Sequence, residues 1–255
     1  MLPSFRKIRW RLVANNQFFK YSRYAIGEIV LVVIGILIAL QINNWNNQRL
    51  FDKQMTSFLI GMIDDLKSDT LQIENSIKYY NGLIEQKRMI LQLTSFEEID
   101  TDSLFYMAQS RTANYTINTS TFDKIRSTGI TQISNNSSLS KSIYNYYTVS
   151  FNSLKDYMNW DVDESKGVFN YFINGKNMYE INLVGYDLEA SDKLLNFQNE
   201  SVRKKNLIEL FSEPSARNLL KRDYGRKQVV RRVLEETKVE ATILIQNIEE
   251  ELHKN

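Results

Sequence analysis

The chain has 255 residues, with 32 Lys and Arg against 30 Asp and Glu, a net charge of +2, one histidine and no cysteine. The lack of cysteine excludes disulfides, a thiolate nucleophile and a cysteine-based zinc site, and the single His253 excludes a histidine-based metal site and a Ser-His triad. The sequence therefore predicts no catalytic residue, no cofactor and no metal ligand.

The first 23 residues read as a basic amphipathic segment. Six basic residues and no acidic one precede Glu28, whereas the rest of the chain carries 26 basic and 30 acidic residues. At helical spacing an apolar face lies beside the basic one, at Phe5, Ile8, Leu12 and Val13. Because the positive excess is confined to this segment, we expect it to contact anionic lipid headgroups and expect no nucleic-acid partner.

Residues 24–43 read as a transmembrane signal anchor. From Ile29 to Leu40 no side chain is polar, and at ~1.5 Å per residue about twenty helical residues cover the ~30 Å of a bilayer's hydrocarbon layer. Basic residues beside a span stay in the cytoplasm, so we expect a bacterial inner-membrane protein with a cytoplasmic N-terminus and residues 44–255 in the periplasm. A cleaved signal peptide is the alternative, although residues 38–41 lack the small-x-small pattern of a cleavage site.

One face of this span is a candidate contact surface. Small residues and one leucine recur every four positions, at Gly27, Leu31, Gly35 and Ala39, a spacing that lets transmembrane helices approach closely. Glu28 lies one turn inside the span, where a carboxylate needs water, a proton or a partner. Two readings stay open: Glu28 reaches back to the headgroups, or it contacts a second helix in a homo-oligomer or a partner protein.

Beyond the span the sequence predicts a long stalk helix. A polar collar at residues 43–48 is followed by apolar residues at gaps of three, four and seven, namely Leu59, Met62, Leu66, Ile73, Ile77, Tyr80, Ile84 and Leu91. No proline lies between Pro3 and Pro214. We therefore expect the membrane helix to continue into the stalk.

Shorter helices are expected in the middle of the chain. Asp100 or Thr101 caps the first, and residues 114–121 are expected to be loop-like or briefly extended. Thr121 is the predicted N-cap of a helix from Phe122, and Gly129 is its C′ residue.

The next predicted helix starts at Ser137 and Ser138. Its expected inward positions, with a possible extension to the last four, are Leu139, Ile143, Tyr146, Tyr147, Phe151, Leu154, Met158, Val162, Phe169 and Phe172. Tyrosine-rich clusters at residues 79–80, 144–147 and 171–172 either fill a core or line a ligand groove. Residues 174–185 read as a turn-rich connection, and residues 194–211 as one or two short helices.

Several acidic groups are candidate sites. Asp161, Asp163 and Ser165 have the spacing of the first calcium-loop ligands, but Lys166 occupies the turn-glycine position. The two readings are a metal loop and a solvated helix face. The carboxylates of residues 64, 65 and 200 are expected to be surface charges.

A long C-terminal helix ends the chain. Ser212 is its expected cap, and Pro214 lies in its first turn. Apolar or small residues then alternate by four and three, at Val230, Leu234, Thr237, Ala241, Leu244 and Ile248, which predicts a coiled-coil-like seam against the stalk helix. The expected fold is thus all-α: an amphipathic segment, a span continuing into a stalk, and a helical bundle closed by the C-terminal helix.

Two segments resemble a large bacterial membrane-protein family known only as a domain of unknown function. The run FFKYSRYAIGEIVLVVIGILIALQINNWNNQR is similar to its N-terminal signature, and TFDKIRSTGITQISNNSSLSKSIYNYY to its middle motif. The matching positions in the second segment are Phe122, Ile125, Gly129, Ile133, Asn135, Ile143, Tyr146 and Tyr147. The resemblance implies a single-span envelope protein with a helical extracytoplasmic domain, and brings no activity, substrate or catalytic residue.

From these patterns we expect a non-enzymatic scaffold or accessory subunit whose periplasmic domain binds a partner. A periplasmic ligand sensor that signals through a partner protein is the second reading. A carboxylate-dependent envelope hydrolase is the third, and a buried pocket with one Asp or Glu at its base would favour it.

Overall fold

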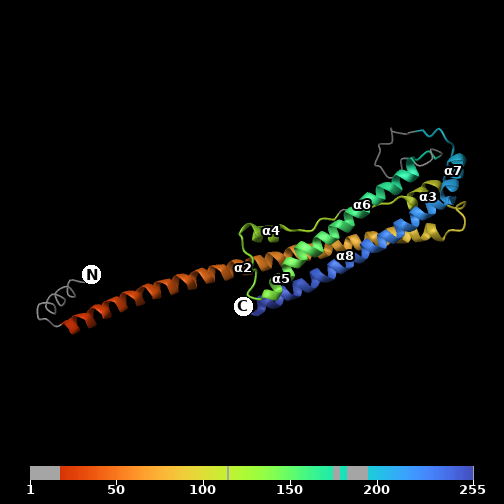
Figure 1. Ribbon diagram of the computed structural model, residues 1–255. Helices are drawn as coiled ribbons and strands as arrows, with labels where there is room; N and C mark the ends of the chain where they lie inside the picture. The colour runs from red at the N-terminus through yellow and green to blue at the C-terminus, as the bar shows by residue number, and fades with distance from the viewer. Residues whose placement is uncertain (1–17, 114, 175–178, 183–194, 255) are drawn as a thin grey trace. The chain divides into compact units, whose positions relative to one another are not determined.

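The computed structural model describes residues 18–113, 115–174, 179–182 and 195–254 (Figure 1). All regular elements in these ranges are helices, which confirms the predicted all-α class: α2 (Phe18–Gln92), α3 (Thr101–Ala108), α4 (Ser120–Ser127), α5 (Ser137–Asn145), the π-helical turn η1 (Tyr146–Ser150), α6 (Phe151–Asn174), α7 (Glu200–Ser212) and α8 (Pro214–Lys254). The predicted amphipathic face at residues 5–13 and most of the connection at residues 174–185 lie outside the described residues.

The chain forms two compact units, Met1–Ser57 and Phe58–Asn255. In the first, α2 contains an 18-residue window with a mean hydropathy of 2.6 in which no residue is buried. Ile29 and Leu31, for example, are 63% and 70% exposed. This helix is long and apolar enough to cross a membrane, as the sequence predicts.

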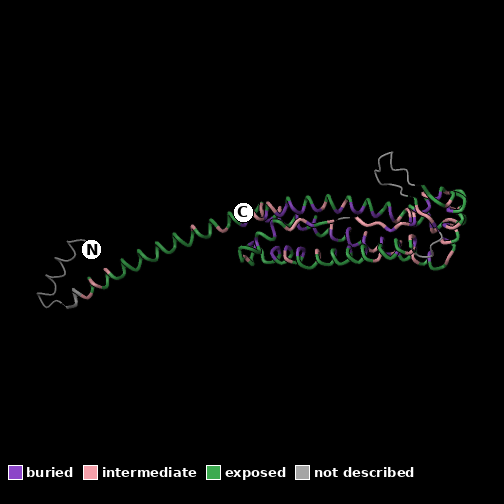
Figure 2. Tube along the Cα trace, turned by 90° about the horizontal axis from the view of Figure 1, so that it is seen from above, coloured by how far each residue is buried: buried purple, intermediate pink, exposed green. Residues whose placement is uncertain are grey.

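In the second unit, α2, α6 and α8 lie side by side along their length (Figures 1 and 2). Ion pairs from α2 to α8 show that these two helices are antiparallel: Lys67 lies 3.1 Å from Glu249, Glu74 pairs with Lys238, and Lys87 lies 3.4 Å from Asp223. The whole predicted α8 seam is buried. Its partner is not the stalk helix alone, because α8 also packs along α6.

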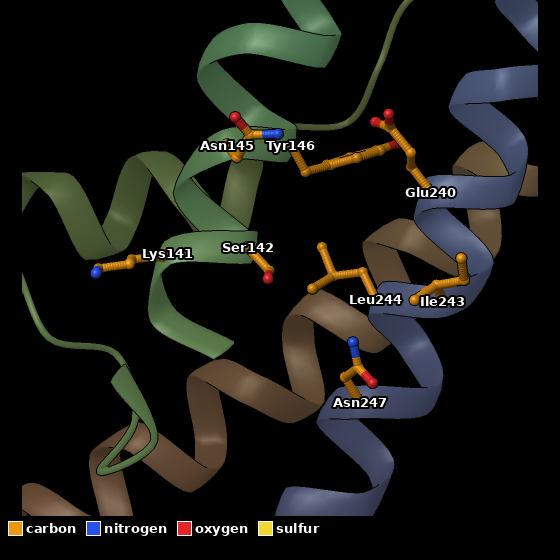
Figure 3. Close-up of a pocket in the computed structure, with 8 residues that line it drawn as sticks. All are labelled: Lys141, Ser142, Asn145, Tyr146, Glu240, Ile243, Leu244 and Asn247. Carbon is orange, nitrogen blue, oxygen red and sulfur yellow. The ribbon is translucent and has the colours of Figure 1, made fainter. Parts of the chain in front are cut away.

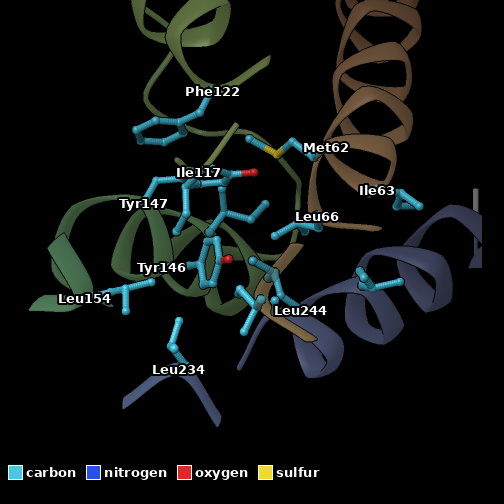
Figure 4. Packing of buried hydrophobic residues seen from close by; sticks show 14 of the residues in the cluster. Met62, Ile63, Leu66, Ile117, Phe122, Tyr146, Tyr147, Leu154, Leu234 and Leu244 are labelled. Carbon is cyan, nitrogen blue, oxygen red and sulfur yellow. The ribbon is translucent and has the colours of Figure 1, made fainter. Parts of the chain in front are cut away.

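Two hydrophobic clusters fill this unit. The larger one joins α2, α4, α5, η1, the start of α6 and α8 (Figure 4). The smaller one joins α3, α7 and the adjoining ends of α2, α6 and α8. Along α2 the change of cluster falls between Leu83 and Ile90, with buried Lys87 between them. On this helix Leu83 and Ile90 occupy the core rather than Ile84 and Leu91, which are half-buried.

Capping residues account for several helix ends. Asp100 is the N-cap of α3, and its carboxylate accepts a 2.9 Å hydrogen bond from the Ser103 N–H. Asn136 caps α5 in the same way through two N–H groups, so this helix starts at Ser137 as expected. Gly129 has φ +72° just after α4, which confirms its predicted C′ role.

Two predicted caps are wrong. Helix α4 begins at Ser120, two residues earlier than expected, and the buried Thr121 N–H is satisfied by a carboxylate of α2, at 3.0 Å from Asp65 Oδ2. Ser212 belongs to the end of α7, where its hydroxyl donates to the Ile208 carbonyl. Pro214 does open α8, where its missing N–H costs no hydrogen bond.

Candidate functional site

The residues of the resemblance motif converge in space. Six of its positions are buried in the larger cluster, namely Phe122, Ile125, Ile133, Ile143, Tyr146 and Tyr147. The Phe122 ring stacks on the Tyr147 ring with centroids 4.6 Å apart, and the Tyr146 ring meets Tyr147 edge-on at 5.1 Å (Figure 4). The motif's remaining positions, Gly129 and Asn135, are exposed in the connection between α4 and α5.

Two carboxylates of α2 accept hydrogen bonds from the segment at the start of α4, beside this motif. Asp65 accepts hydrogen bonds from the Asn118 side chain at 2.7 Å and from the Thr121 N–H at 3.0 Å, and Asp69 accepts one from the Asn118 N–H at 2.9 Å. Both aspartates are buried. The expectation that Asp65 is a surface charge is therefore wrong, although its neighbour Asp64 is exposed. The i, i+4 spacing places both carboxylates on the inner face of α2.

We call Asp69, Tyr115, Tyr146 and Tyr147 the tyrosine–aspartate cluster. The three phenol hydroxyls and Oδ2 of Asp69 are buried and have no hydrogen-bond partner among the described residues. Burial raises the pKa of Asp69 to about 6; the Asn118 N–H opposes this and the Asp65 carboxylate adds to it. Burial, and then the negative charge of Asp69, raise the pKa of Tyr115 and Tyr146. The Asp69 carboxyl group therefore stays protonated up to about pH 6, and in this neutral form it has an O–H to donate.

An open groove adjoins this cluster. It has a volume of about 500 Å³ and runs between α5, the start of η1 and α8 (Figure 3). Its lining is mixed in polarity, consisting of Lys141, Ser142, Asn145, Tyr146, Glu240, Ile243, Leu244 and Asn247. Tyr146 belongs to both features, because its ring is buried in the core while its hydroxyl end points toward Glu240 in the groove.

The calcium-loop segment is not a loop. Asp161 lies inside α6, is fully buried, and accepts hydrogen bonds from the Tyr80 hydroxyl at 2.7 Å, Arg226 Nε at 2.7 Å and Lys227 Nζ at 2.8 Å. Asp163 points outward, where its carboxylate is 73% exposed and pairs with Lys166. The metal-loop reading fails because the carboxylates of Asp161 and Asp163 do not converge on one point. The reading as a solvated helix face fails for Asp161 because this residue is buried. The described residues contain no cluster of metal-ligating side chains.

Asp161 is part of a buried charged layer with Lys87, Asp223, Arg226 and Lys227. Lys87 donates to three consecutive carbonyl groups, those of residues 107, 108 and 109, at 2.8, 2.7 and 2.6 Å. Burial lowers its pKa to about 8, against the opposing attraction of the Asp223 carboxylate. These contacts hold α2, α6, α8 and the segment after α3 together.

The predicted membrane contact face lies within α2. Cβ atoms built at Gly27 and Gly35 would meet no atom within 4 Å, and Leu31 and the other apolar residues around it are exposed. The contact role of these residues, of Glu28 and of Ala39 stays a prediction.

Sequence reasoning missed Asp69, Tyr115 and Glu240. A signal was present for Asp69, because residues 62, 66, 69 and 73 follow the spacing of one helix face. Tyr115 lies in a loop and Glu240 on an exposed helix position, where no periodic pattern marks a site. The geometry does not favour a hydrolase, since the Asp69 carboxylate is fully buried and has no access to a substrate.

The chain matches a known protein family. Residues 28–181 match the model of a family of unknown function, DUF6090. The matched range contains the tyrosine–aspartate cluster and the α5 side of the groove, and it ends before α8. No curated protein and no solved structure matches the chain.

Proposed function

The chain belongs to the DUF6090 family of unknown function, and from this premise we propose that it is a single-span protein of a bacterial inner membrane. Residues 1–23 are cytoplasmic, residues 24–43 cross the bilayer, and residues 44–255 form a periplasmic helical domain. The domain acts without chemistry of its own, as a scaffold or accessory subunit that binds a partner protein.

The observation that carries the anchoring is the exposed apolar segment of α2. Its 18-residue window has a mean hydropathy of 2.6 and buries no residue. Such a surface is costly in water and stable in hydrocarbon. The six basic residues before Glu28 support a cytoplasmic N-terminus.

Topology can be tested by cysteine labelling, because the natural chain has no cysteine. Ser127→Cys is placed at an exposed position of α4, and Ser4→Cys in the basic segment. In intact spheroplasts, a membrane-impermeant maleimide should label Ser127→Cys, and it should label Ser4→Cys only after permeabilisation. The opposite pattern, or labelling of both without permeabilisation, would contradict the proposed orientation.

Partner binding is supported by an exposed aromatic surface on α6. Tyr157 and Trp160 are 38% and 42% exposed, and their rings meet edge-on with centroids 6.3 Å apart. Val149, which lies in η1 three turns before Trp160, is 57% exposed. Aromatic side chains are enriched in protein interfaces, so this surface is suited to contact another periplasmic protein.

Site-specific photocrosslinking in native membranes tests this role. A photoreactive amino acid at Tyr157 or Trp160 should give one defined protein adduct, identified by mass spectrometry. The same substitution at Lys166, which is exposed on another face of α6, serves as the control and should give none. Recovery of the monomer alone from both positions would refute the scaffold function.

A ligand-sensing module is the second candidate, and the groove beside Tyr146 favours it. A sensor of this design would signal through a partner protein in the membrane. Ligand binding that changes the crosslinking pattern at Trp160 would support this alternative over a passive scaffold.

A further inference from the structure

We propose that the groove between α5 and α8 binds a small organic amine, with the protonated amino group held by Glu240 and the Tyr146 hydroxyl. This site lies beyond the anchoring and partner binding proposed above. Its polar end is formed by Asn145, Tyr146 and Glu240, and its apolar wall by Ile243 and Leu244 (Figure 3).

Glu240 is an uncompensated negative charge at this polar end. Its carboxylate makes no ion pair or hydrogen bond with the described residues, whereas on the same helix Glu235 pairs with Arg231 at 3.5 Å and Glu249 with Lys67 at 3.1 Å. Lys141 also lines the groove, but its ammonium group points away from Glu240 (Figure 3). A cationic ligand would therefore supply the missing counter-charge.

Tyr146 adds a second group that lacks a partner. The residue is 3% exposed, and its hydroxyl has no hydrogen-bond partner among the described residues. Its ring runs along the groove toward Glu240 (Figure 3). An ammonium group placed between them would donate one hydrogen bond to the carboxylate and another to the phenol oxygen. A buried polar atom aimed into a groove distinguishes this place from an ordinary surface depression.

The remaining lining defines the class of amine. Leu244 and Ile243 offer apolar contact for a short hydrocarbon chain, and the Asn247 amide stands at the other end of the groove (Figure 3). The volume of about 500 Å³ is within the usual range for small-molecule sites. A short aliphatic amine with a second polar end matches this order of groups.

Cadaverine is the probe, and glutarate, with the same number of carbons and the opposite charge, is its matched control. Binding is measured by titration calorimetry on the full chain in detergent micelles. We expect cadaverine to bind with one-to-one stoichiometry and glutarate not to bind. Glu240→Gln should weaken cadaverine binding about tenfold or more, the equivalent of one charge-assisted hydrogen bond. Tyr146→Phe, which keeps the ring, should weaken it several-fold.

Glu236→Gln is the control variant, because Glu236 is exposed on the same helix and does not line the groove. It should bind cadaverine as the natural chain does. Circular dichroism checks that each variant is folded. The proposal is overturned if cadaverine does not bind, if Glu240→Gln and Glu236→Gln bind it equally, or if glutarate binds as well. None of these results depends on membrane orientation or on a protein partner, so they leave the proposed function standing.

Discussion

Lys227 Nζ lies 2.8 Å from Oδ1 of Asp161, and neither side chain is exposed to solvent. Moving two charges out of water is expensive, and the attraction between them offsets the cost only when the remaining polar atoms are also satisfied. Here Tyr80 and Arg226 satisfy the other sites of the Asp161 carboxylate. The pair therefore fixes how α6 and α8 align, because a shift of one turn would separate it.

Replacing Asp161 should destabilise the domain strongly. Asp161→Asn keeps the shape of the side chain but leaves Asp223 as the one buried carboxylate beside the cations Lys227 and Arg226, and breaking a buried ion pair costs about 3–5 kcal/mol. Denaturant unfolding of the full chain in detergent, followed by circular dichroism, measures the effect. Asp163→Asn is the control on the same helix and should change stability by less than about 0.5 kcal/mol. Equal stabilities of the two variants would show that the buried pair contributes little.

Two glycines should respond to alanine in opposite directions. Gly129 has φ +72°, where an L-residue is strained, so Gly129→Ala should cost about 1–2 kcal/mol. Gly167 lies inside α6, is exposed, and has open space around its Cα. Gly167→Ala should therefore stabilise the chain by about 0.5–1 kcal/mol through helix propensity. Thermal unfolding of both variants checks the signs, and a loss in Gly167→Ala would contradict the open environment.

The tyrosine–aspartate cluster should make stability depend on pH. The pKa of Asp69 is raised to about 6 from its usual 3.8, so the folded chain holds this proton at pH values where the unfolded chain has released it. Folding stability should therefore fall as pH rises from about 4 to about 6, by roughly 3 kcal/mol in total. The loss persists above that window.

Asp69→Asn removes this titration while keeping an acceptor for the Asn118 N–H. The free energy of unfolding of Asp69→Asn, minus that of the natural chain, should therefore be larger at pH 7.5 than at pH 4.5. Denaturant unfolding at the two pH values measures this difference. Asp64→Asn, at an exposed position of the same helix, should follow the natural chain at both pH values. Parallel curves for Asp69→Asn and the natural chain would refute the raised pKa.

The small-residue face of the span can be tested in liposomes. Gly35→Leu should reduce energy transfer between labelled copies, because a large side chain prevents close approach of two helices. Val33→Leu places similar bulk on another face and should leave the signal unchanged. Unchanged transfer in Gly35→Leu would remove this face as a contact surface.

Glu28→Leu separates the two readings of the Glu28 carboxylate, which either reaches back to the headgroups or contacts a second helix. If a membrane pull-down recovers the partner equally well with this variant, the contact with a second helix is eliminated.

Apolar spacing predicted the helices well and the charged layer not at all. The α8 seam continues backward from Val230 with the same alternation, through residues 227, 223, 220 and 216, and every one of these positions is buried. Lys227 and Asp223 can occupy buried positions of this seam because each has a partner of opposite charge on a neighbouring helix. Lys227 pairs with Asp161 of α6, and Asp223 pairs with Lys87 of α2. A rule that assigns charged residues to the surface cannot detect such pairs from one helix.

The rule that places charged residues on the surface also explains the wrong predictions on α6. Val162 and Phe169 were expected inside, but both are exposed, and the inward positions between Met158 and Phe172 are Asp161, Ser165 and Val168. Polar residues take the core side there because Lys227 Nζ donates to both Asp161 and Ser165. The candidate site was out of reach for a related reason: Tyr115 and Asp69 come together only through the loop before α4.

The charged layer also separates the two ends of the helical domain. Hydrophobic side chains on its two sides belong to separate clusters, so few apolar contacts cross it. Cooperative units of a protein often follow such boundaries. Within the single compact unit Phe58–Asn255, we therefore expect the end that holds α3 and α7 to open locally while the end that holds the tyrosine–aspartate cluster and the groove stays folded.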